Sequence, residues 1–386
     1  MIIDGDGHFV EPPDWAEKYL SAEWRKKLAS QAPAGDPTAG LPFGIGDALT
    51  PGGLKPGRPK RRTLAQAERG GFDPKERLVM HDREGIDAAV LYPTMGLGYC
   101  GIEDPEWALA ACEAVNRIGA DYCAASPKEL YAVAALPTVF PELAARELRR
   151  CVKEYGFIGG IVRPNPPSNG RTLDNPSLEI LWATAEDLDV ALCIHTVSAP
   201  GDRSFAGAAR ARAWFFGHAM AHSIEAMYAF GEMYQGRVFD RHPRLRAGYM
   251  ESGSGWPSFW VDRLHEHAEV LGWLVDPKIE RLPGEVFREQ CVVTAEGEDR
   301  MAPVTQSFYG DEKVLWASDY PHFDVEPPYV AEMQERRDLT PAQKDGIFRR
   351  AALRFYKLDE DAIARAGRKR RGDASPSRKP SAGERA

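Results

Sequence analysis

The feature that most constrains the fold is an alternation of short apolar runs with longer amphipathic segments along the chain. Each apolar run is bounded by Gly, Pro or Asp, as buried parallel strands are, and each amphipathic segment has the length of a helix. The apolar runs occupy residues 1–5, 88–92, 130–136, 158–163, 191–195, 245–251, 291–295 and 314–319. Helical segments lie between them, for example at 105–122, 141–155, 176–188, 219–235 and 256–271. Eight strands alternating with helices predict an α/β fold, a (βα)8 barrel of the TIM type, and 386 residues suit one such barrel with insertions.

Two segments depart from the barrel pattern. Residues 31–71 follow the first strand, are rich in Pro, Gly, Lys and Arg, and are too long for a structureless loop without a role. We expect an inserted loop, either a lid over the catalytic face or an insertion on the barrel exterior. A last helix at 341–358 completes a barrel domain of residues 1–360. Residues 361–386 are basic and rich in Ser, Pro and Gly, which predicts a disordered tail.

Composition and charge limit the class of protein. Hydrophobic residues make up 43% and charged residues 27% of the chain, as in soluble globular proteins. The net charge is −8, and the most basic stretch, 367–379, lies in the tail, where a solvated segment is favoured over a contact with nucleic acid, so we expect no nucleic-acid partner. No apolar run approaches the ~18 residues of a membrane span, and six scattered cysteines suit a reducing compartment. We therefore expect a cytoplasmic protein with no membrane partner, for which a homodimer is a compatible assembly.

Carboxylate and imidazole side chains occur where the predicted strands end. Alternate residues of a strand share a face, so Asp4, Asp6 and His8 should point the same way. His195 ends the fifth strand and Asp319 the eighth, and the carboxyl ends of barrel strands form the rim where active sites lie. Two imidazoles and two carboxylates suit one divalent ion, Zn²⁺ first, with Mn²⁺ or Fe²⁺ as alternatives. Each residue alone could be a structural hydrogen-bonding group, and their joint occurrence favours the metal.

Longer motifs surround these residues. The chain has DGH at 6–8 followed by EPP at 11–13, IH at 194–195, PRL at 243–245 and ASDYPH at 317–322. With these motifs it resembles, over nearly the whole barrel, the amidohydrolase-related family that includes aminocarboxymuconate semialdehyde decarboxylases and related decarboxylases, hydratases and hydrolases. The resemblance implies that Asp6, His8, His195 and Asp319 hold the metal, with Asp4 as a less favoured first ligand. The fourth strand offers no lysine to bridge two ions, so one ion is expected.

Position 251 departs from the family pattern. Decarboxylases of the family resemble one another in having His where this chain has Glu251, and some add Glu where it has Ser254. Glu251 could act as a general base, bind the metal as an extra ligand, or pair with an arginine such as Arg263. Because its charge would repel a substrate carboxylate, we expect water addition or hydrolysis rather than decarboxylation.

Further side chains could complete the site. His322, on the loop after the eighth strand, could protonate a leaving group or orient substrate, or cap the chain locally. Arg163 ends the fourth strand and would bind a substrate carboxylate or enolate, unless it forms a structural ion pair. Trp256 could wall an apolar pocket, and His218, which shares a helix face with His222, could reach the mouth of the barrel. Core packing and structural hydrogen bonding are the alternatives for these last residues.

Together, the residues and the resemblance predict a mononuclear metal-dependent hydrolase of a small, aromatic or carboxylated molecule. The ion would lower the pKa of its bound water towards ~7. Asp319 would accept the water's proton, with Glu251 and His322 as further acid–base groups. The first alternative is a metal-dependent decarboxylase, a carbon–carbon lyase. The second is a barrel that binds a ligand without turnover, against which the intact ligand set argues.

Overall fold

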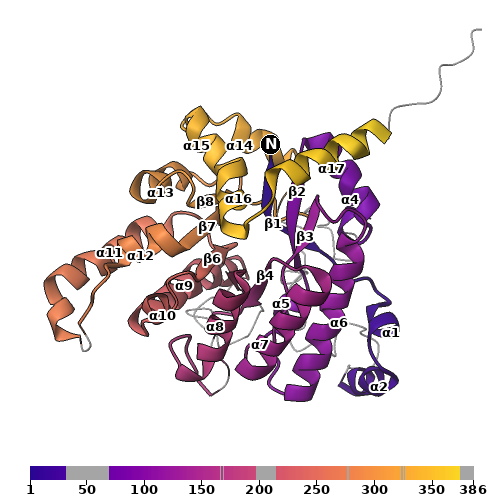
Figure 1. Cartoon of the computed structure of the whole chain (residues 1–386), viewed down its shortest axis with the longest axis horizontal. Coiled ribbons are helices and arrows are strands. Elements are labelled where there is room, and N and C mark those ends of the chain that lie inside the picture. Colours follow the sequence, from indigo (N-terminus) through magenta and orange to yellow (C-terminus); the bar gives the residue numbers. More distant parts are fainter. Residues whose placement is uncertain are drawn as a thin grey trace, which may run out of the picture.

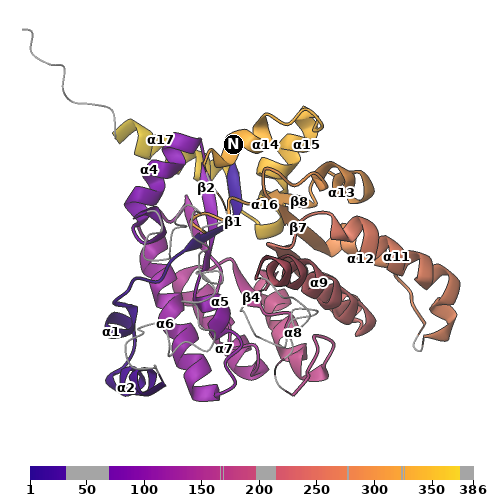
Figure 2. The ribbon, with the colours of Figure 1, turned by 180° about the vertical axis from the view of Figure 1, so that it is seen from behind.

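A computed structural model describes residues 1–31, 69–165, 167, 169–196, 214–275, 278–322, 325 and 327–373. Parallel strands lie at the centre and helices surround them (Figures 1 and 2). In this part of the chain the strands are β1 (Ile3–Phe9), β2 (Ala88–Pro93), β3 (Leu130–Ala132), β4 (Gly159–Val162), β5 (Ala191–His195), β6 (Arg246–Met250), β7 (Cys291–Ala295) and β8 (Val314–Trp316). Each overlaps one predicted run, although β1 continues to Phe9. The predicted number and order of strands are therefore confirmed.

The strands form two parallel sheets, β1 to β3 and β4 to β8, which meet at both edges. A parallel bridge between Ala134 and Gly160 joins the β3 side to β4. At the other edge, the Asp319 N–H donates to the Asp6 carbonyl at 3.1 Å, and the His8 N–H donates to the Tyr320 carbonyl at 2.8 Å. These bonds connect the segment after β8 to β1 and bring their functional side chains together.

The helices follow the strands and cover the outside of the sheets (Figure 1). Most begin where proline or a capping side chain favours a first turn. The Asp104 carboxylate, for instance, accepts the Trp107 N–H at 2.9 Å, directly before Pro105. The α-helices are α1 (Trp15–Tyr19), α2 (Ala22–Gln31), α4 (Pro74–Glu84), α5 (Gly96–Tyr99), α6 (Pro105–Cys123), α7 (Pro141–Arg150), α8 (Glu179–Leu188), α9 (Trp214–Gln235), α10 (Val238–Arg241), α11 (Trp256–Leu271), α12 (Pro283–Gln290), α13 (Ala302–Tyr309), α14 (Tyr329–Gln334), α15 (Pro341–Asp345), α16 (Ala351–Tyr356) and α17 (Glu360–Asp373). Short 3₁₀ and π turns are η2 (Arg69–Gly71), η3 (Cys151–Tyr155), η4 (Pro176–Leu178), η6 (Gly272–Leu274) and η7 (Gly346–Arg350).

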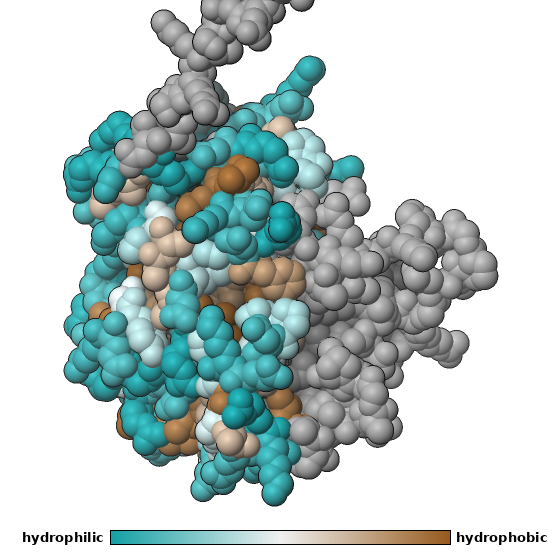
Figure 3. Space-filling model, turned by 90° about the vertical axis from the view of Figure 1, so that its right-hand side faces the viewer, coloured by the Kyte–Doolittle hydropathy of each residue, from teal (hydrophilic) through white to brown (hydrophobic). Residues whose placement is uncertain are grey.

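The core lies between the sheets and the surrounding helices. β2 and β5 are buried along their whole length, as expected for parallel strands that are covered on both faces. All six cysteines are buried free thiols, which behave as small apolar side chains. By contrast, the side of the molecule shown in Figure 3 carries mostly hydrophilic residues among those coloured.

The C-terminal segment differs from its prediction. Residues 361–373 were expected to belong to a disordered tail, but they form most of α17, which lies beside α4 (Figures 1 and 2). The reason is that one apolar and one charged side chain of this segment contact the barrel, which its composition does not indicate. Ile363 is fully buried, and the Arg370 guanidinium bonds the carboxylates of Asp82 and Glu129. The rest of the predicted tail lies outside the described residues.

Two further predictions concern the inserted loop after the first strand and membrane-spanning helices. Most of the predicted lid at 31–71 lies outside the described residues, and its role stays a prediction. Among the helices that the structure describes, none combines the length and apolar character that crossing a bilayer requires.

Candidate metal centre

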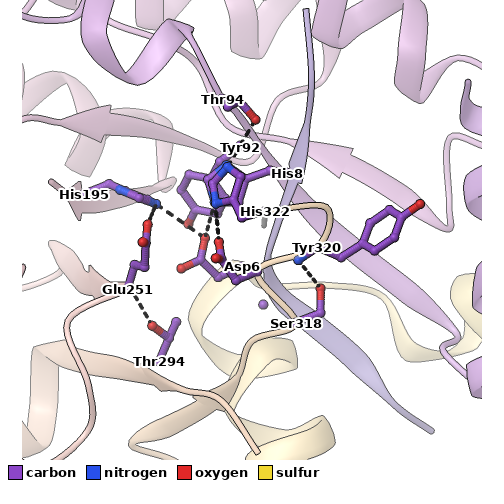
Figure 4. A network of polar contacts seen from close by, with 12 residues as sticks. Asp6, His8, Tyr92, Thr94, His195, Glu251, Thr294, Ser318, Tyr320 and His322 are labelled. Carbon is purple, nitrogen blue, oxygen red and sulfur yellow. Dashed lines mark hydrogen bonds and ion pairs between the residues drawn. The ribbon is translucent and has the colours of Figure 1, made fainter. Parts of the chain in front are cut away.

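Four side chains predicted from the sequence to bind a metal meet at the carboxyl ends of the strands. Asp6 and His8 come from β1 and His195 is the last residue of β5 (Figure 4). Asp319 follows β8. All four are at most 3% exposed. The barrel thus buries two imidazoles and two carboxylates in one place.

The ligand atoms form two overlapping groups that share His8: those of Asp6, His8 and His195 lie within 4.8 Å of one another, and so do those of His8, Glu251, Asp319 and His322. His8 Nε2 lies 3.3 Å from Asp319 Oδ1 and 3.7 Å from Asp6 Oδ1, and His195 Nε2 lies 3.8 Å from Asp6 Oδ1. Among the described residues, Asp6 Oδ1, His8 Nε2 and His195 Nε2 have no hydrogen-bond partner. Buried polar atoms in native proteins are nearly always satisfied, so this concentration of unsatisfied ligand atoms fits a divalent cation.

The tautomer of His195 also fits a ligand. Its Nδ1 lies 2.8 Å from the carbonyl oxygen of Thr196, which places the ring proton on Nδ1 and the lone pair on Nε2. Metal-binding histidines usually donate their other ring N–H in this way.

Burial sets the protonation of the cluster. Burial, and secondarily His322, lowers the pKa of His8 to about 4, and burial with the nearby His8 holds the pKa of His195 well below its ordinary value. Burial also opposes ionisation of Asp319, but His322 and His8 beside it hold its pKa well below the usual range. For Asp6, burial and the charge of Asp319 raise the pKa well above that range. A cation would supply the positive charge that lets both carboxylates ionise together.

Asp4 does not join this cluster, so the prediction that it shares a face with Asp6 and His8 is wrong. The pairing of β1 with β2 shifts register between Asp4 and Gly7, which turns Asp4 to the other side. There the Asp4 carboxylate accepts the Ser318 N–H at 3.0 Å and the Ser318 hydroxyl at 2.6 Å, and pairs with Arg77 at 3.3 Å. A Cβ on Gly7 would lie 2.4 Å from the Arg77 guanidinium and 2.5 Å from the Asp4 carboxylate, so a side chain at position 7 would clash with this ion pair.

Glu251 borders the cluster from the end of β6. One carboxylate oxygen lies 3.5 Å from His195 Nε2 and the other lies 3.5 Å from His222 Nδ1. His222, on α9, also donates from Nδ1 to the Glu251 carbonyl at 2.8 Å. Arg263, one predicted partner of Glu251, instead pairs with Glu266.

Two residues of the site adopt a costly backbone conformation. Glu251 and Asp319 both have φ of +48°, in the left-handed region that non-glycine residues avoid. Hydrogen bonds hold both in place: the Glu251 N–H donates to Thr294 Oγ1 at 2.9 Å, and the Asp319 N–H donates to the Asp6 carbonyl. Such strain is typical of functional positions.

Comparison with known proteins places this site in a family. A family model described as Amidohydrolase matches residues 3–358. The chain belongs to the amidohydrolase family. This confirms the predicted family and barrel fold, and makes the chain an enzyme of the amidohydrolase superfamily.

The relatives of this chain include decarboxylases and a hydratase. Gamma-resorcylate decarboxylase of Polaromonas sp. is 30% identical over 300 residues, which cover 73% of this chain and 87% of that protein. The 2-keto-4-carboxy-3-hexenedioate hydratase of Sphingobium sp. is 25% identical over 383 residues, 95% of this chain and 99% of that protein. The structure of 5-carboxyvanillate decarboxylase from Novosphingobium aromaticivorans, complexed with manganese and 4-hydroxy-3-methoxy-5-nitrobenzoic acid, superposes with a TM-score of 0.69. It is 18% identical, covers 93% of this chain and 96% of that one, and is evidence for the fold alone.

Two further residues predicted to belong to the site, His322 and Arg163, lie near the ends of the strands. His322 lies at the cluster, with Nδ1 2.8 Å from Asp319 Oδ1 and its ring centroid 4.1 Å from that of His8. Arg163 follows β4, is 8% exposed, and donates to Asn165 Oδ1 at 3.2 Å. Its role in binding substrate stays a prediction.

Trp256 was predicted to wall the pocket, but the structure places it in the core. Its ring centroid lies 5.1 Å from that of Tyr249, 6.0 Å from Phe287 and 6.3 Å from Phe230. Its indole N–H donates to Ser252 Oγ at 3.2 Å. The sequence could not reveal this, because an aromatic residue at the first turn of α11 can turn towards either the rim or the core.

Of the two histidines on α9, His222 contacts Glu251, with Nδ1 3.5 Å from a carboxylate oxygen, and the His218 ring centroid lies 4.4 Å from that of His222. Sequence reasoning also gave Glu11 no role beyond its motif. Its buried carboxylate accepts the N–H groups of Met95 at 2.9 Å and Gly96 at 2.8 Å, and so fixes the chain after β2. The signals available were the spacing of the two histidines and the EPP motif that follows β1.

Proposed function

We propose that the chain is a metal-dependent decarboxylase, a carbon–carbon lyase, of a small aromatic or unsaturated carboxylic acid with a hydroxyl or keto group beside the carboxylate. The observation that carries the proposal is the position of Asp319, whose Oδ1 lies 3.3 Å from His8 and 2.8 Å from His322 within the buried cluster. The decarboxylases among its relatives support lyase chemistry over the hydrolysis expected from the sequence.

Asp6, His8, His195 and Asp319 would hold one divalent ion. When bound, the ion would bind the substrate carboxylate with its neighbouring oxygen and offset their charge. Two carboxylate ligands suit Mn²⁺, and manganese is present in solved decarboxylases of this fold, so we place it ahead of the zinc expected from the sequence.

The protein's own groups would handle the proton. Decarboxylation breaks the bond between the substrate carbon and its carboxyl group, releases CO₂, and forms a C–H bond at the same carbon, so one proton enters per turnover. The Asp319–His322 pair holds a proton beside the bound substrate and donates it to that carbon. His322 is oriented by Thr94, whose Oγ1 lies 3.3 Å from Nε2. Arg163 would bind an anionic group of the substrate.

Glu251 does not exclude a carboxylate substrate. Its two oxygens lie 3.5 Å from ring nitrogens of His195 and His222, and its carboxylate adjoins His8, Asp319 and His322, so a bound divalent ion would offset its charge. Hydrolysis is the second candidate, because a carboxylate at this position could also serve as the base for a water molecule.

The test is product analysis with manganese-loaded protein and a panel of ortho-hydroxybenzoic acids and unsaturated keto acids. We expect CO₂ release and, in D₂O, one deuterium at the carbon that carried the carboxyl group. Asp319→Asn should lower kcat at least ~100-fold. The matched surface variant Asp338→Asn, whose carboxylate pairs with Arg336, should keep full activity. Products cleaved with the uptake of water, formed without CO₂, would establish the hydrolase instead.

A further inference from the structure

A second group of metal-binding side chains adjoins the cluster described above. His218, His222 and Glu251 each offer a ligand atom, and these atoms lie within 4.8 Å of one another. Two imidazoles and one carboxylate form a common ligand set for zinc. Neither His218 nor His222 belongs to the set formed by Asp6, His8, His195 and Asp319.

Helix α9 presents the two imidazoles together. His218 and His222 are four residues apart, so they lie on one face of the helix, and their ring centroids are 4.4 Å apart. Histidines at this spacing can bind one ion from a single helix.

His222 has the orientation that a ligand needs. Its Nδ1 donates to the Glu251 carbonyl at 2.8 Å, as the Nδ1 of His195 bonds the Thr196 carbonyl at 2.8 Å. This bond fixes the tautomer, so the lone pair of the neutral ring is on Nε2. A second bond, from Ser223 Oγ to the Ser252 carbonyl at 2.8 Å, fixes α9 against the segment after β6.

Glu251 connects the two groups. One of its oxygens lies 3.5 Å from His195 Nε2 (Figure 4), and the other lies 3.5 Å from Nδ1 of His222, the ring nitrogen that also bonds the Glu251 carbonyl. Its backbone is held at φ +48° between Thr294 and His222. The fold therefore maintains an unfavourable conformation that directs one carboxylate to two imidazole groups.

We propose that His218, His222 and Glu251 form a second divalent-cation site, which Glu251 joins to the first as a shared carboxylate. Because two of its three ligands are nitrogen, this site prefers Zn²⁺ or a similar borderline ion, whereas the first, with two carboxylates, also accepts Mn²⁺. The proposal concerns cation binding and does not depend on which reaction the enzyme catalyses.

The experiment measures zinc per chain by mass spectrometry after the full-length protein is stripped with a chelator, saturated with Zn²⁺ and dialysed. We expect two ions in the wild-type protein and one in both His218→Ala and His222→Ala. The control is His267→Ala, an exposed histidine on α11 that bonds the Arg263 carbonyl, which should keep two ions.

Fewer than two zinc ions in the wild-type protein, or two in a folded His218→Ala variant, would overturn the second site. His218 is only half-buried, so its variant keeps the test valid if His222→Ala fails to fold, which circular dichroism would reveal. The two proposals fail separately. A one-ion protein that releases CO₂ loses only the second site, and a two-ion protein that releases none loses only the proposed reaction.

Discussion

At the scale of single residues, Asp4 shows how a buried carboxylate can shape the site without facing it. It connects Arg77 of α4 with Ser318 in the segment that carries Asp319. Burial raises the pKa of Asp4 and the Arg77 guanidinium opposes that rise. Arg77 also donates to the His8 carbonyl at 2.9 Å, so this pair fixes the backbone of two metal-site segments.

Replacing Arg77 with Met should therefore lower the free energy of unfolding by about 3–5 kcal/mol, because it leaves the Asp4 carboxylate buried without its counter-charge. Chemical denaturation would measure this change. The control is Arg263→Met, since Arg263 forms an exposed pair with Glu266 and its loss should matter by less than about 0.5 kcal/mol. Equal effects in the two variants would contradict the role given to Arg77.

The strained backbone of Glu251 predicts an unusual order of stability. Both Glu251→Gly and Glu251→Ala remove the carboxylate, but only glycine adopts φ of +48° without a steric cost. The glycine variant should be more stable than the alanine variant by about 1 kcal/mol, measured by thermal denaturation. At the exposed helical position Glu266 the order should reverse by a similar amount. An alanine variant at 251 that matches or exceeds the glycine variant would argue against strain.

At the scale of elements, two features give the site its geometry. The register shift in β1 separates Asp4 from Asp6 and His8 and leaves the latter two facing the centre. Helix α9 places His222 against the end of β6, where its side-chain Nδ1 donates to the Glu251 carbonyl and aligns the two elements. Neither feature follows from hydrophobic periodicity, because both depend on contacts between distant segments.

Helix α17 offers a test of how an element attaches to the barrel. Ile363 is fully buried, so Ile363→Ala should lower the free energy of unfolding by about 2–5 kcal/mol through lost packing and the cavity left behind. Lys369 is exposed on the same helix, and Lys369→Ala should change stability by less than about 0.5 kcal/mol. Urea denaturation of the two variants provides the comparison. A neutral Ile363 variant would mean that α17 does not dock as described.

At the scale of the whole molecule, closure of the barrel unites residues from opposite ends of the chain. Ser318 and Asp4 bond although they are 314 positions apart, and the bonds between the segments after β8 and β1 align Asp319 with Asp6. A metal held between these segments should therefore stabilise the entire fold, because the ligands are close together only when the barrel is closed.

Removal of the metal should accordingly destabilise the protein. A ligand that binds only the folded state at 100 times its Kd adds ~2.7 kcal/mol, so manganese-loaded protein should lose about that much stability when a chelator is added. His8→Ala, which lacks a proposed ligand, should respond much less, whereas His267→Ala should respond like the wild type. Differential scanning calorimetry measures all three. A wild-type protein whose melting temperature ignores the chelator would count against a metal in the closed barrel.

The sequence by itself determined the barrel and predicted which residues gather at its centre. Apolar periodicity is a local property, so it located the eight strands of the described chain, and the acids and histidines at their ends predicted Asp4, Asp6, His8, His195 and Asp319 as candidate ligands, among which the family resemblance favoured Asp6 over Asp4. The tertiary structure alone decided which side chains meet. A register shift turned Asp4 away, packing against Tyr249 took Trp256 into the core, and burial of Ile363 ordered part of an expected tail. These outcomes depend on neighbours far along the chain, whose positions exist only once the barrel has closed.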